Sequence, residues 1–375
     1  MTAPRHVYVH VPFCARRCSY CDFAIAVRRE VPWADFVDGV ARELAVRGIA
    51  PGAHPVDTLY FGGGTPSHLG PAGVRHLVAV LRDHFAWSDD AEVTLEANPE
   101  DVTPDAVHAW RDAGITRVSL GAQSFDERVL RWMHRLHDAA TIDRAIAAIR
   151  EAGFASWSFD LIFAVPDTLA RDWRTDLHRA LDAAPPHLSL YGLTVEQGTP
   201  LGRWVERDEV APADEDRWAD EFLEADEAAR AGGYEHYEVS NFARPGHRAV
   251  HNSAYWRGVP YLGLGPSAHG FDGTRRRWNV AAYAAWLAAL REARDPLAGD
   301  ETLDHAARTA EAVYLGLRTT DGLALRDDEE AALVAPWIEA GWARREPPAR
   351  LVCTPRGWQR LDALAATLTR HRDPG

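Results

Sequence analysis

The sequence contains no lysine: the 41 basic residues in this chain of 375 are all arginine. This absence excludes chemistry that depends on a lysine amine, such as a P-loop phosphate site, a Schiff base or pyridoxal phosphate catalysis. The chain also has no run of eighteen apolar residues, so we expect no transmembrane helix. Cysteine is scarce, with four in the chain. The candidate functional residues must therefore be sought among the few cysteines and the other side chains that can bind a cofactor or a metal.

Basic charge is outnumbered by acidic charge. The chain has 55 acidic against 41 basic residues and a net charge of −14, which disfavours nucleic acid as its main partner. Only a few residues precede the first apolar run, without the charged, apolar and cleavage segments of a secretion signal. We therefore expect a cytoplasmic, reducing location. The hydrophobic content of 46% and the 14 tryptophans indicate a well-buried globular fold.

Three of the four cysteines stand close together in one loop, at Cys14, Cys18 and Cys21. Three thiolates fill three corners of a cubane iron–sulfur cluster and leave the fourth iron open, where a substrate or cofactor can dock. The alternative from spacing alone is a zinc site completed by His6 or His10. A disulfide is disfavoured because the remaining Cys353 lies far along the chain, where a buried thiol is the default.

Apolar runs alternate with helical patterns through the first part of the chain. Six runs read as strands, at residues 7–11, 58–61, 92–97, 116–120, 158–163 and 188–193. Helical spacing of apolar residues follows at 33–47, 71–85, 104–112, 141–152, 171–183 and 214–231. Strands separated by helices imply right-handed parallel crossovers. We therefore predict an α/β fold, a partial (β/α)6 TIM-like barrel with a lateral opening for a large ligand.

The composition changes after this barrel, which we assign to residues 1–235. Residues 236–275 form a connecting region rich in aromatics, glycine and histidine, with little periodicity. Residues 276–375 form a smaller, mostly helical C-terminal domain, with helical patterns at 281–293, 302–317, 327–340 and 358–368 and a short strand at 351–354. A winged-helix-like arrangement is one interpretation of this domain, but the net charge gives no support for DNA binding.

Chemically distinctive residues lie at or near the ends of the predicted strands. Gly62, Gly63 and Gly64 allow a backbone to approach a ligand closely, although an ordinary turn has the same composition. Glu96 and Asp160 are charges inside apolar strands, and each must be satisfied by a ligand or by an internal partner such as Arg135. Such positions at carboxyl strand ends are where a parallel barrel carries its function.

One further stretch is unusual: His251-Asn252-Ser253-Ala254-Tyr255-Trp256. A histidine near aromatic rings can bind a metal or haem iron and cover a flat ring. Composition alone favours a packed aromatic segment.

The order of these motifs resembles the radical S-adenosylmethionine (SAM) superfamily, and within it the oxygen-independent coproporphyrinogen III oxidase group. The resemblance begins with Tyr8-Val9-His10-Val11-Pro12-Phe13-Cys14 and continues through Cys18, Tyr20, Cys21, residues 62–66, Glu96, residues 121–125, Arg135 and residues 160–166. It covers most of the chain. It implies a radical SAM barrel and a 4Fe–4S cluster held by Cys14, Cys18 and Cys21, with SAM on the fourth iron.

The resemblance also implies which residues contact SAM. By position they are Tyr8, Tyr20, Gly63, Gly64, Thr65, Glu96, Gln123, Arg135, Asp160 and Thr194. In this superfamily an electron donor, which the sequence does not identify, reduces the cluster, and SAM is cleaved to methionine and a 5′-deoxyadenosyl radical.

Within the group, the sequence is more similar to the haem-chaperone branch than to the oxidases. The oxidases have a further cysteine where this chain has Phe23, and an N-terminal extension where it has a few residues. The stretch at 251–256 matches the H-N-x-x-Y-W pattern associated with haem binding in that branch, which implies that His251 contacts haem. The resemblance thus implies a protein that passes haem to acceptors such as respiratory cytochromes. The alternative is an enzyme that decarboxylates coproporphyrinogen III to protoporphyrinogen IX, and the oligomeric state stays open, a homodimer included.

Overall fold

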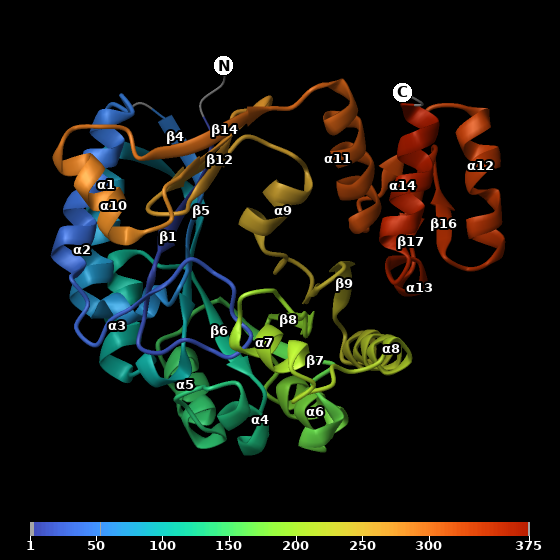
Figure 1. Ribbon diagram of the computed structural model, residues 1–375, viewed down its shortest axis with the longest axis horizontal. Coiled ribbons are helices and arrows are strands. Elements are labelled where there is room, and N and C mark those ends of the chain that lie inside the picture. The colour runs from blue at the N-terminus through green and yellow to red at the C-terminus, as the bar shows by residue number, and fades with distance from the viewer. Residues whose placement is uncertain (1–3, 53, 374–375) are drawn as a thin grey trace.

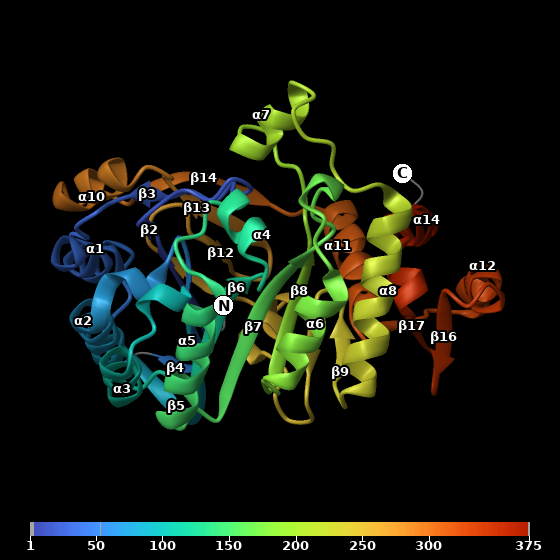
Figure 2. The same ribbon diagram turned by 90° about the horizontal axis from the view of Figure 1, so that it is seen from below.

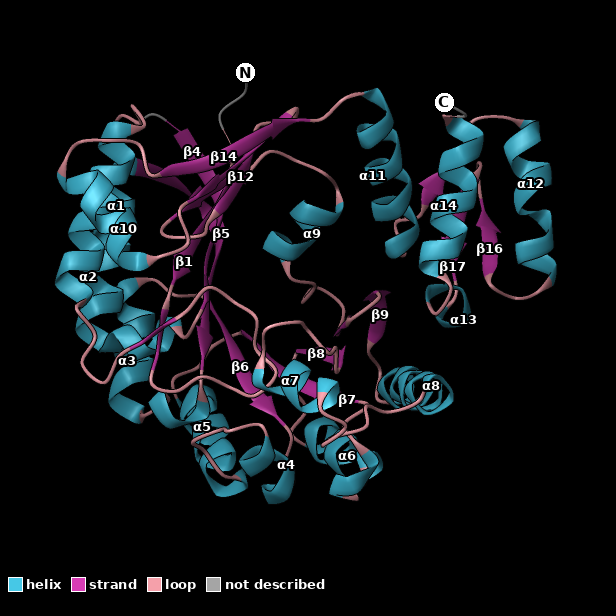
Figure 3. Cartoon of the chain, viewed as in Figure 1, coloured by secondary structure: helices cyan, strands magenta, loops and turns pink. Residues whose placement is uncertain are grey.

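The predicted apolar runs form six parallel strands of one sheet (Figures 1 and 3). They are β1 (His6–Val11), β4 (His54–Gly63), β5 (Phe85–Ala97), β6 (Arg117–Gln123), β7 (Ser156–Phe163) and β8 (His187–Gly192). The computed structural model describes residues 4–52 and 54–373, so most of the short segment before the first strand lies outside the described residues. The six strands lie side by side in this order, which confirms the six strand predictions and the barrel-like sheet.

Helices cover the outer face of this sheet, as the crossover argument predicts (Figure 2). They are α1 (Trp33–Val46), α2 (Gly70–His84), α3 (Pro104–Ala113), α5 (Ala139–Glu151), α6 (Trp173–Asp182) and α8 (Glu215–Ala231). Each buries one apolar stripe, as α2 does with Val74, Leu77 and Leu81. Short helices α4 (Glu127–Trp132) and α7 (Pro200–Glu206) and the short paired strands β2 (Phe13–Cys14) and β3 (Ala26–Val27) lie in the connections.

Three short strands extend the sheet at its two edges. β10 (Asn241–Ala243) pairs antiparallel with β8, and β9 (Glu235–Glu238) pairs with β10. β11 (Leu262–Leu264) pairs parallel with β1 at the other edge. Between them comes α9 (Val250–Trp256). The periodicity of residues 236–275 did not predict these elements, because strands of three or four residues are too short to show a repeat. The strand order runs from β11 to β9 without closing, so the described sheet is an open barrel.

The remaining residues form two small sheets with helices beside them. One sheet contains β12 (His269–Phe271), β13 (Arg275–Asn279) and β14 (Leu297–Thr302), and α10 (Tyr283–Arg291) packs on α1. The other contains β15 (Leu323–Ala324), β16 (Ala343–Glu346) and β17 (Arg350–Cys353). The helices of this last part are α11 (His305–Arg318), α12 (Asp328–Glu339), the short α13 (Pro355–Trp358) and α14 (Leu361–Arg372). The predicted helices are present, and Cys353 is the buried thiol that we expected.

Among the helices that the structure describes, we find none with both the length and the apolar character required to cross a membrane.

Candidate cofactor site

The carboxyl ends of the parallel strands surround a cavity of about 410 Å³. Most of the predicted site residues line it: Cys14, Cys18, Cys21, Tyr20, Gly63, Gly64, Thr65, Glu96, Gln123, Arg135, Asp160 and Thr194. Tyr8 lines a neighbouring cavity of about 390 Å³, which shares Glu96 and Phe23 with the first. His251 lines neither of these two cavities. The fold thus brings together residues that are far apart in the sequence.

Two backbone hydrogen bonds hold the cysteine loop against the glycine loop that follows β4. Gly64 N donates to Val11 O (2.8 Å) and Thr65 N donates to Phe13 O (2.8 Å). A Cβ atom on Gly64 would lie 2.7 Å from the carbonyl oxygen of Pro12, so the approach of the two loops requires glycine.

Two side chains donate hydrogen bonds to the cysteine thiols. Thr65 Oγ1 donates to Cys14 Sγ (3.4 Å), and Arg135 Nη1 donates to Cys18 Sγ (3.3 Å). Burial raises the pKa of Cys14 to about 11, so this side chain is a thiol until a metal withdraws its proton. Three thiols that line one cavity, two of them with donors to stabilise a thiolate, fit the ligation of three corners of a 4Fe–4S cluster.

The zinc alternative lacks its fourth ligand. His10 Nε2 donates to Ala24 O (2.9 Å), and its Nδ1 accepts from Tyr8 Oη (3.1 Å), so both ring nitrogens are engaged. His6 lies at the opposite end of β1 from the cysteines and bonds to Thr58 Oγ1 (2.9 Å). In the part of the chain that the structure describes, no three His, Cys, Asp or Glu side chains are arranged to hold a single metal ion.

The Glu96 carboxylate faces the cavity from the carboxyl end of β5. It accepts hydrogen bonds from Tyr60 Oη (2.7 Å) and from Gly63 N (3.2 Å), both neutral donors. Burial raises the pKa of Glu96 to about 7, and the neighbouring Asp160 carboxylate contributes in the same direction. A carboxylate satisfied only by neutral donors, with one side toward a cavity, is suited to accept an ammonium group or a ribose hydroxyl.

Asp160 lies on β7 and lines the same cavity as Glu96. Ser119 Oγ lies 3.2 Å from each of its carboxylate oxygens. Burial raises the pKa of Asp160 to about 6, although hydrogen bonds from Ser189 and Ser119 act in the opposite direction. The strand charge that we identified in the sequence therefore has hydroxyl partners in the protein.

The Arg135 guanidinium donates its hydrogen bonds to groups other than the Asp160 carboxylate. Its Nη2 donates to Asn98 Oδ1 (2.6 Å) and to Gly121 O (2.9 Å), while Nη1 reaches Cys18. Its buried Nε has no acceptor among the described residues. Asn98 lines the cavity as well and was missed from the sequence, although its place directly after β5 was a signal.

Tyr20 and Thr194 complete the predicted lining. Thr194 Oγ1 donates to Gly192 O (3.4 Å) just beyond β8. Tyr8 stacks on Tyr60 with ring centroids 6.1 Å apart, and it reaches the neighbouring cavity. Glu96 lines both cavities, whereas Tyr8 lines the neighbouring one alone of the two.

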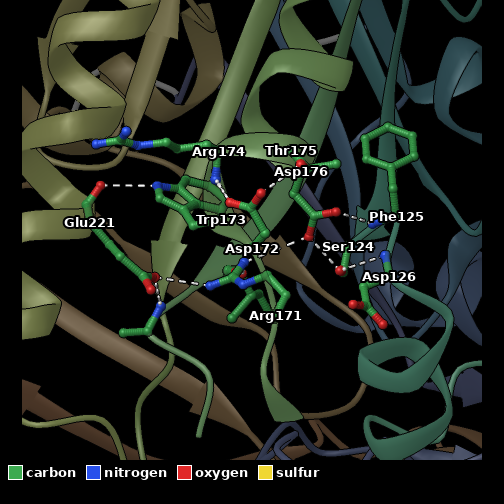
Figure 4. Close-up of polar contacts among 12 residues, drawn as sticks. Ser124, Phe125, Asp126, Arg171, Asp172, Trp173, Arg174, Thr175, Asp176 and Glu221 are labelled. Carbon is green, nitrogen blue, oxygen red and sulfur yellow. Dashed lines mark hydrogen bonds and ion pairs between the residues drawn. The ribbon is translucent and has the colours of Figure 1, made fainter. Parts of the chain in front are cut away.

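Gln123 ends β6 in the left-handed region, with φ of 68°, which residues with a side chain rarely adopt. The two residues that follow it are anchored to Asp176 of α6 (Figure 4). Ser124 Oγ donates to Asp176 Oδ2 (2.5 Å), and Phe125 N donates to Asp176 Oδ1 (2.9 Å). This anchor fixes the direction in which Gln123 enters the cavity.

A buried charge network extends this anchor to the end of β7 (Figure 4). Arg171 Nη1 lies 3.6 Å from Asp176 Oδ2, and Arg171 Nη2 donates to Glu221 Oε2 (2.9 Å). Arg171 also donates to Ile162 O (3.1 Å), and Ala164 N donates to Glu221 Oε2 (2.6 Å). The network thus holds the ends of β6 and β7, the strands that carry Gln123 and Asp160.

Sequence reasoning missed this network. Asp176 and Glu221 stand on the buried faces of α6 and α8, among apolar neighbours. An acid on the apolar face of a helix is the signal that could have identified both residues.

His251 is fully buried at the start of α9. Its Nδ1 lies 2.7 Å from Thr58 Oγ1, its Nε2 lies 2.8 Å from Tyr255 Oη, and its ring stacks on Tyr60. Burial lowers the pKa of His251 to about 3, so the ring is neutral. Because both nitrogens are engaged by hydroxyl groups, a haem contact requires one of these bonds to be released.

Phe23 lines both cavities, yet 58% of the residue is exposed. A large, exposed aromatic side chain therefore belongs to the lining of both cavities.

Comparisons with known proteins agree with this geometry. Residues 8–180 match the Radical SAM superfamily. The "Heme chaperone HemW" of Mycobacterium tuberculosis is 39% identical over 378 residues, covering 97% of this chain and 95% of that protein. The chain belongs to the HemW family of the radical SAM superfamily. The protein of the same name from Synechocystis is 36% identical over 85% of this chain and 79% of its own length.

The fold agrees with that of a solved radical SAM structure. Coproporphyrinogen III oxidase (HemN) from Escherichia coli superposes with a TM-score of 0.83, covering 99% of this chain and 91% of its own, at 22% identity. Membership of the radical SAM superfamily implies a 4Fe–4S cluster and SAM. In this HemW-family chain, the thiols and the open carboxylates of the larger cavity fit both groups.

Proposed function

We propose that this chain binds haem and transfers it to acceptor proteins such as respiratory cytochromes, with a 4Fe–4S cluster and SAM in the barrel cavity. The observation that carries the proposal is Phe23: the cavity keeps the cluster and SAM residues, but an exposed aromatic ring stands where the oxidases have another cysteine. Relatives named as haem chaperones, similar over nearly the whole chain, support the same function.

The cavity residues have separable roles in this proposal. Cys14, Cys18 and Cys21 hold the cluster, which when bound supplies one-electron reduction of the SAM sulfonium. Glu96 and Asp160 accept hydrogen bonds from the ammonium group or the ribose hydroxyls of SAM. Tyr8, Tyr20, Gly63, Gly64, Thr65, Gln123, Arg135 and Thr194 complete the contact set. An electron donor and a reducing cytoplasmic location belong to the same proposal, which holds for a monomer and for a homodimer alike.

His251 is the proposed haem contact on α9. Its neutral ring is in the protonation state that binds iron, but Tyr255 Oη or Thr58 Oγ1 must give up a hydrogen bond of 2.8 or 2.7 Å. The test is a haem titration of the anaerobically reconstituted protein, followed by the Soret band. We expect His251→Ala to weaken the shift and His108→Ala, an exposed histidine on α3, to leave it unchanged. An unchanged titration of His251→Ala would refute the contact.

The transfer function has its own test. Haem-loaded protein is mixed with an apocytochrome, and the reconstituted cytochrome is measured by its absorption. A parallel anaerobic incubation contains SAM, reductant and coproporphyrinogen III. Formation of protoporphyrinogen IX with 5′-deoxyadenosine, and no transfer of haem, would establish the oxidase instead.

A further inference from the structure

Residues of α9 and α11 line a separate cavity of about 480 Å³. These two helices lie where the barrel meets the C-terminal helices (Figure 1). It lies apart from the cluster and SAM residues, none of which lines it. Four arginines line it, namely Arg248, Arg257, Arg308 and Arg350. Apolar surface comes from Trp256, Phe271 and Leu315. We call this cavity the arginine cleft.

The charges of the arginine cleft are unbalanced. Its two acids already have partners, because Glu311 pairs with Arg276, and Asp321 pairs with Arg248 (3.1 Å). Two exposed arginines make no side-chain hydrogen bond or ion pair within the described residues, namely Arg257 and Arg308. In a chain with a net charge of −14, this local excess of guanidinium groups attracts anions, and carboxylates in particular.

Trp256 supplies a second, independent indication of a ligand. The Trp256 ring lines the cleft, and its indole Nε1 is buried and has no acceptor among the described residues. Buried donors without a partner are rare and call for an acceptor from outside the protein. The ring itself is held in place by the Arg318 guanidinium, 4.2 Å from its centroid. Glycines leave parts of the walls without side chains, at Gly258, Gly273, Gly316 and Gly322.

We propose that the arginine cleft binds the carboxylate edge of a planar, apolar dicarboxylate. The inference rests on the proposed haem function, and the ligand is then haem, held by its two propionates. Arg257 at the end of α9 and Arg308 on α11 each take one carboxylate, and the Trp256 ring lies against the ligand. Phe271 and Leu315 cover part of the macrocycle.

The cleft and His251 lie on opposite faces of α9. His251 and Tyr255 point into the barrel, toward Thr58 and Tyr60, whereas Ser253 and Trp256 line the cleft. In this position of α9, a haem held by its carboxylates in the cleft does not reach His251, so the cleft and His251 are two separate positions for haem. The two contacts can be tested separately.

The test compares iron protoporphyrin IX with its dimethyl ester, in which both carboxylates are blocked. The full-length protein is titrated with each, as wild type and as Arg257→Gln, Arg308→Gln and the double variant. Arg75→Gln on the surface of α2 is the matched control, since Arg75 is exposed and lies outside the cleft. The three substituted positions, Arg257, Arg308 and Arg75, are all exposed, so the fold is expected to be unaffected.

We expect each single cleft variant to bind the free acid about tenfold more weakly, because a lost charge-assisted hydrogen bond of this size changes Kd by that factor. Binding of the ester is expected to be weaker in the wild type and unchanged by the variants. Equal Kd values of wild type and double variant for the free acid would refute carboxylate binding in the arginine cleft, without refuting haem binding by the protein. A wild type that binds no haem at all would overturn the proposed function and, with it, this inference.

Discussion

The raised pKa of Glu96 makes a quantitative prediction about SAM binding. In the protein without SAM, burial brings this pKa to about 7, so at neutral pH the side chain is about half protonated. In the proposed site, an ammonium or hydroxyl donor of SAM binds the ionised form. Raising the pH from 6 to 8 increases the ionised fraction from about one tenth to about nine tenths, which is close to a tenfold change in affinity.

The perturbation is Glu96→Gln, which keeps the size of the side chain. Its amide oxygen can accept from Gly63 N, and its NH2 can donate to Tyr60 Oη, because a phenol oxygen also accepts. The assay is anaerobic calorimetry with SAM at both pH values. We expect the ratio of the variant's Kd to that of the wild type to rise about tenfold from pH 6 to pH 8. Titration of SAM itself affects both proteins and cancels in this ratio. A ratio that does not change with pH would refute the reasoning.

The same pKa has a consequence for stability, with the opposite sign. A carboxyl whose pKa rises from 4.5 when unfolded to about 7 when folded stabilises the fold only while it is protonated. That stabilisation is present below about pH 4.5 and is lost as the pH rises through 7. At about 1.36 kcal/mol per pH unit the difference sums to about 3 kcal/mol. SAM-free Glu96→Gln should therefore gain stability over the wild type as the pH rises from 5 to 8, measured by urea unfolding.

Three further predictions concern other parts of the site. Asp176→Ala removes the acceptor of the two hydrogen bonds just after β6 and leaves the buried Arg171 with one partner fewer. We expect the free energy of unfolding in urea to fall by about 3 kcal/mol and SAM to bind more weakly. A fall of less than about 1 kcal/mol would contradict the role of the network. Tyr255→Phe frees His251 Nε2 and should tighten haem binding about two- to tenfold in a Soret titration, whereas weaker binding would mean that the Tyr255 hydroxyl itself holds haem. Gly64→Ala places a methyl group 2.7 Å from the Pro12 carbonyl oxygen and so pushes the cysteine loop away from the glycine loop. Purified protein should therefore contain less iron per chain. An unchanged iron content would refute the requirement for this close approach.

Much of the barrel and of the cofactor cavity followed from local patterns. The six strands are apolar runs of adequate length, and each is flanked by a helix with a clear stripe. Glu96 and Asp160 were identifiable because a charge inside an apolar strand needs a partner, and the structure gives both only neutral hydrogen-bond donors. The parallel topology then places both at one edge of the sheet, where the cysteine loop also lies.

The parts that the sequence did not predict depend on contacts between distant residues. β11 contains three residues and forms because it can pair with the edge strand β1. In this pair Val7 faces Leu262, which lies 255 positions later in the chain. The network of Asp176, Arg171 and Glu221 likewise joins two helices and two strand ends that no local pattern relates. For His251, the motif indicated a contact with haem, but the engagement of both ring nitrogens depends on Thr58 and on the packing of α9.

The anchoring of α9 ties the proposed haem contact to the SAM cavity through two strands. Glu92 of β5 accepts hydrogen bonds from the backbone N–H groups of Val250 (3.1 Å) and His251 (2.9 Å), and thus holds the first turn of α9. Glu96 stands four residues farther along the same strand, about 13 Å away at the rise of a β-strand. Thr58, the partner of His251, lies beside Glu92 on β4, the strand that ends in the glycine loop at Gly63. Release of the hydrogen bond between His251 and Thr58 therefore changes contacts on β4 and β5, the same two strands that position the glycine loop and Glu96. Through these strands, haem at His251 and SAM in the cavity can affect each other's binding.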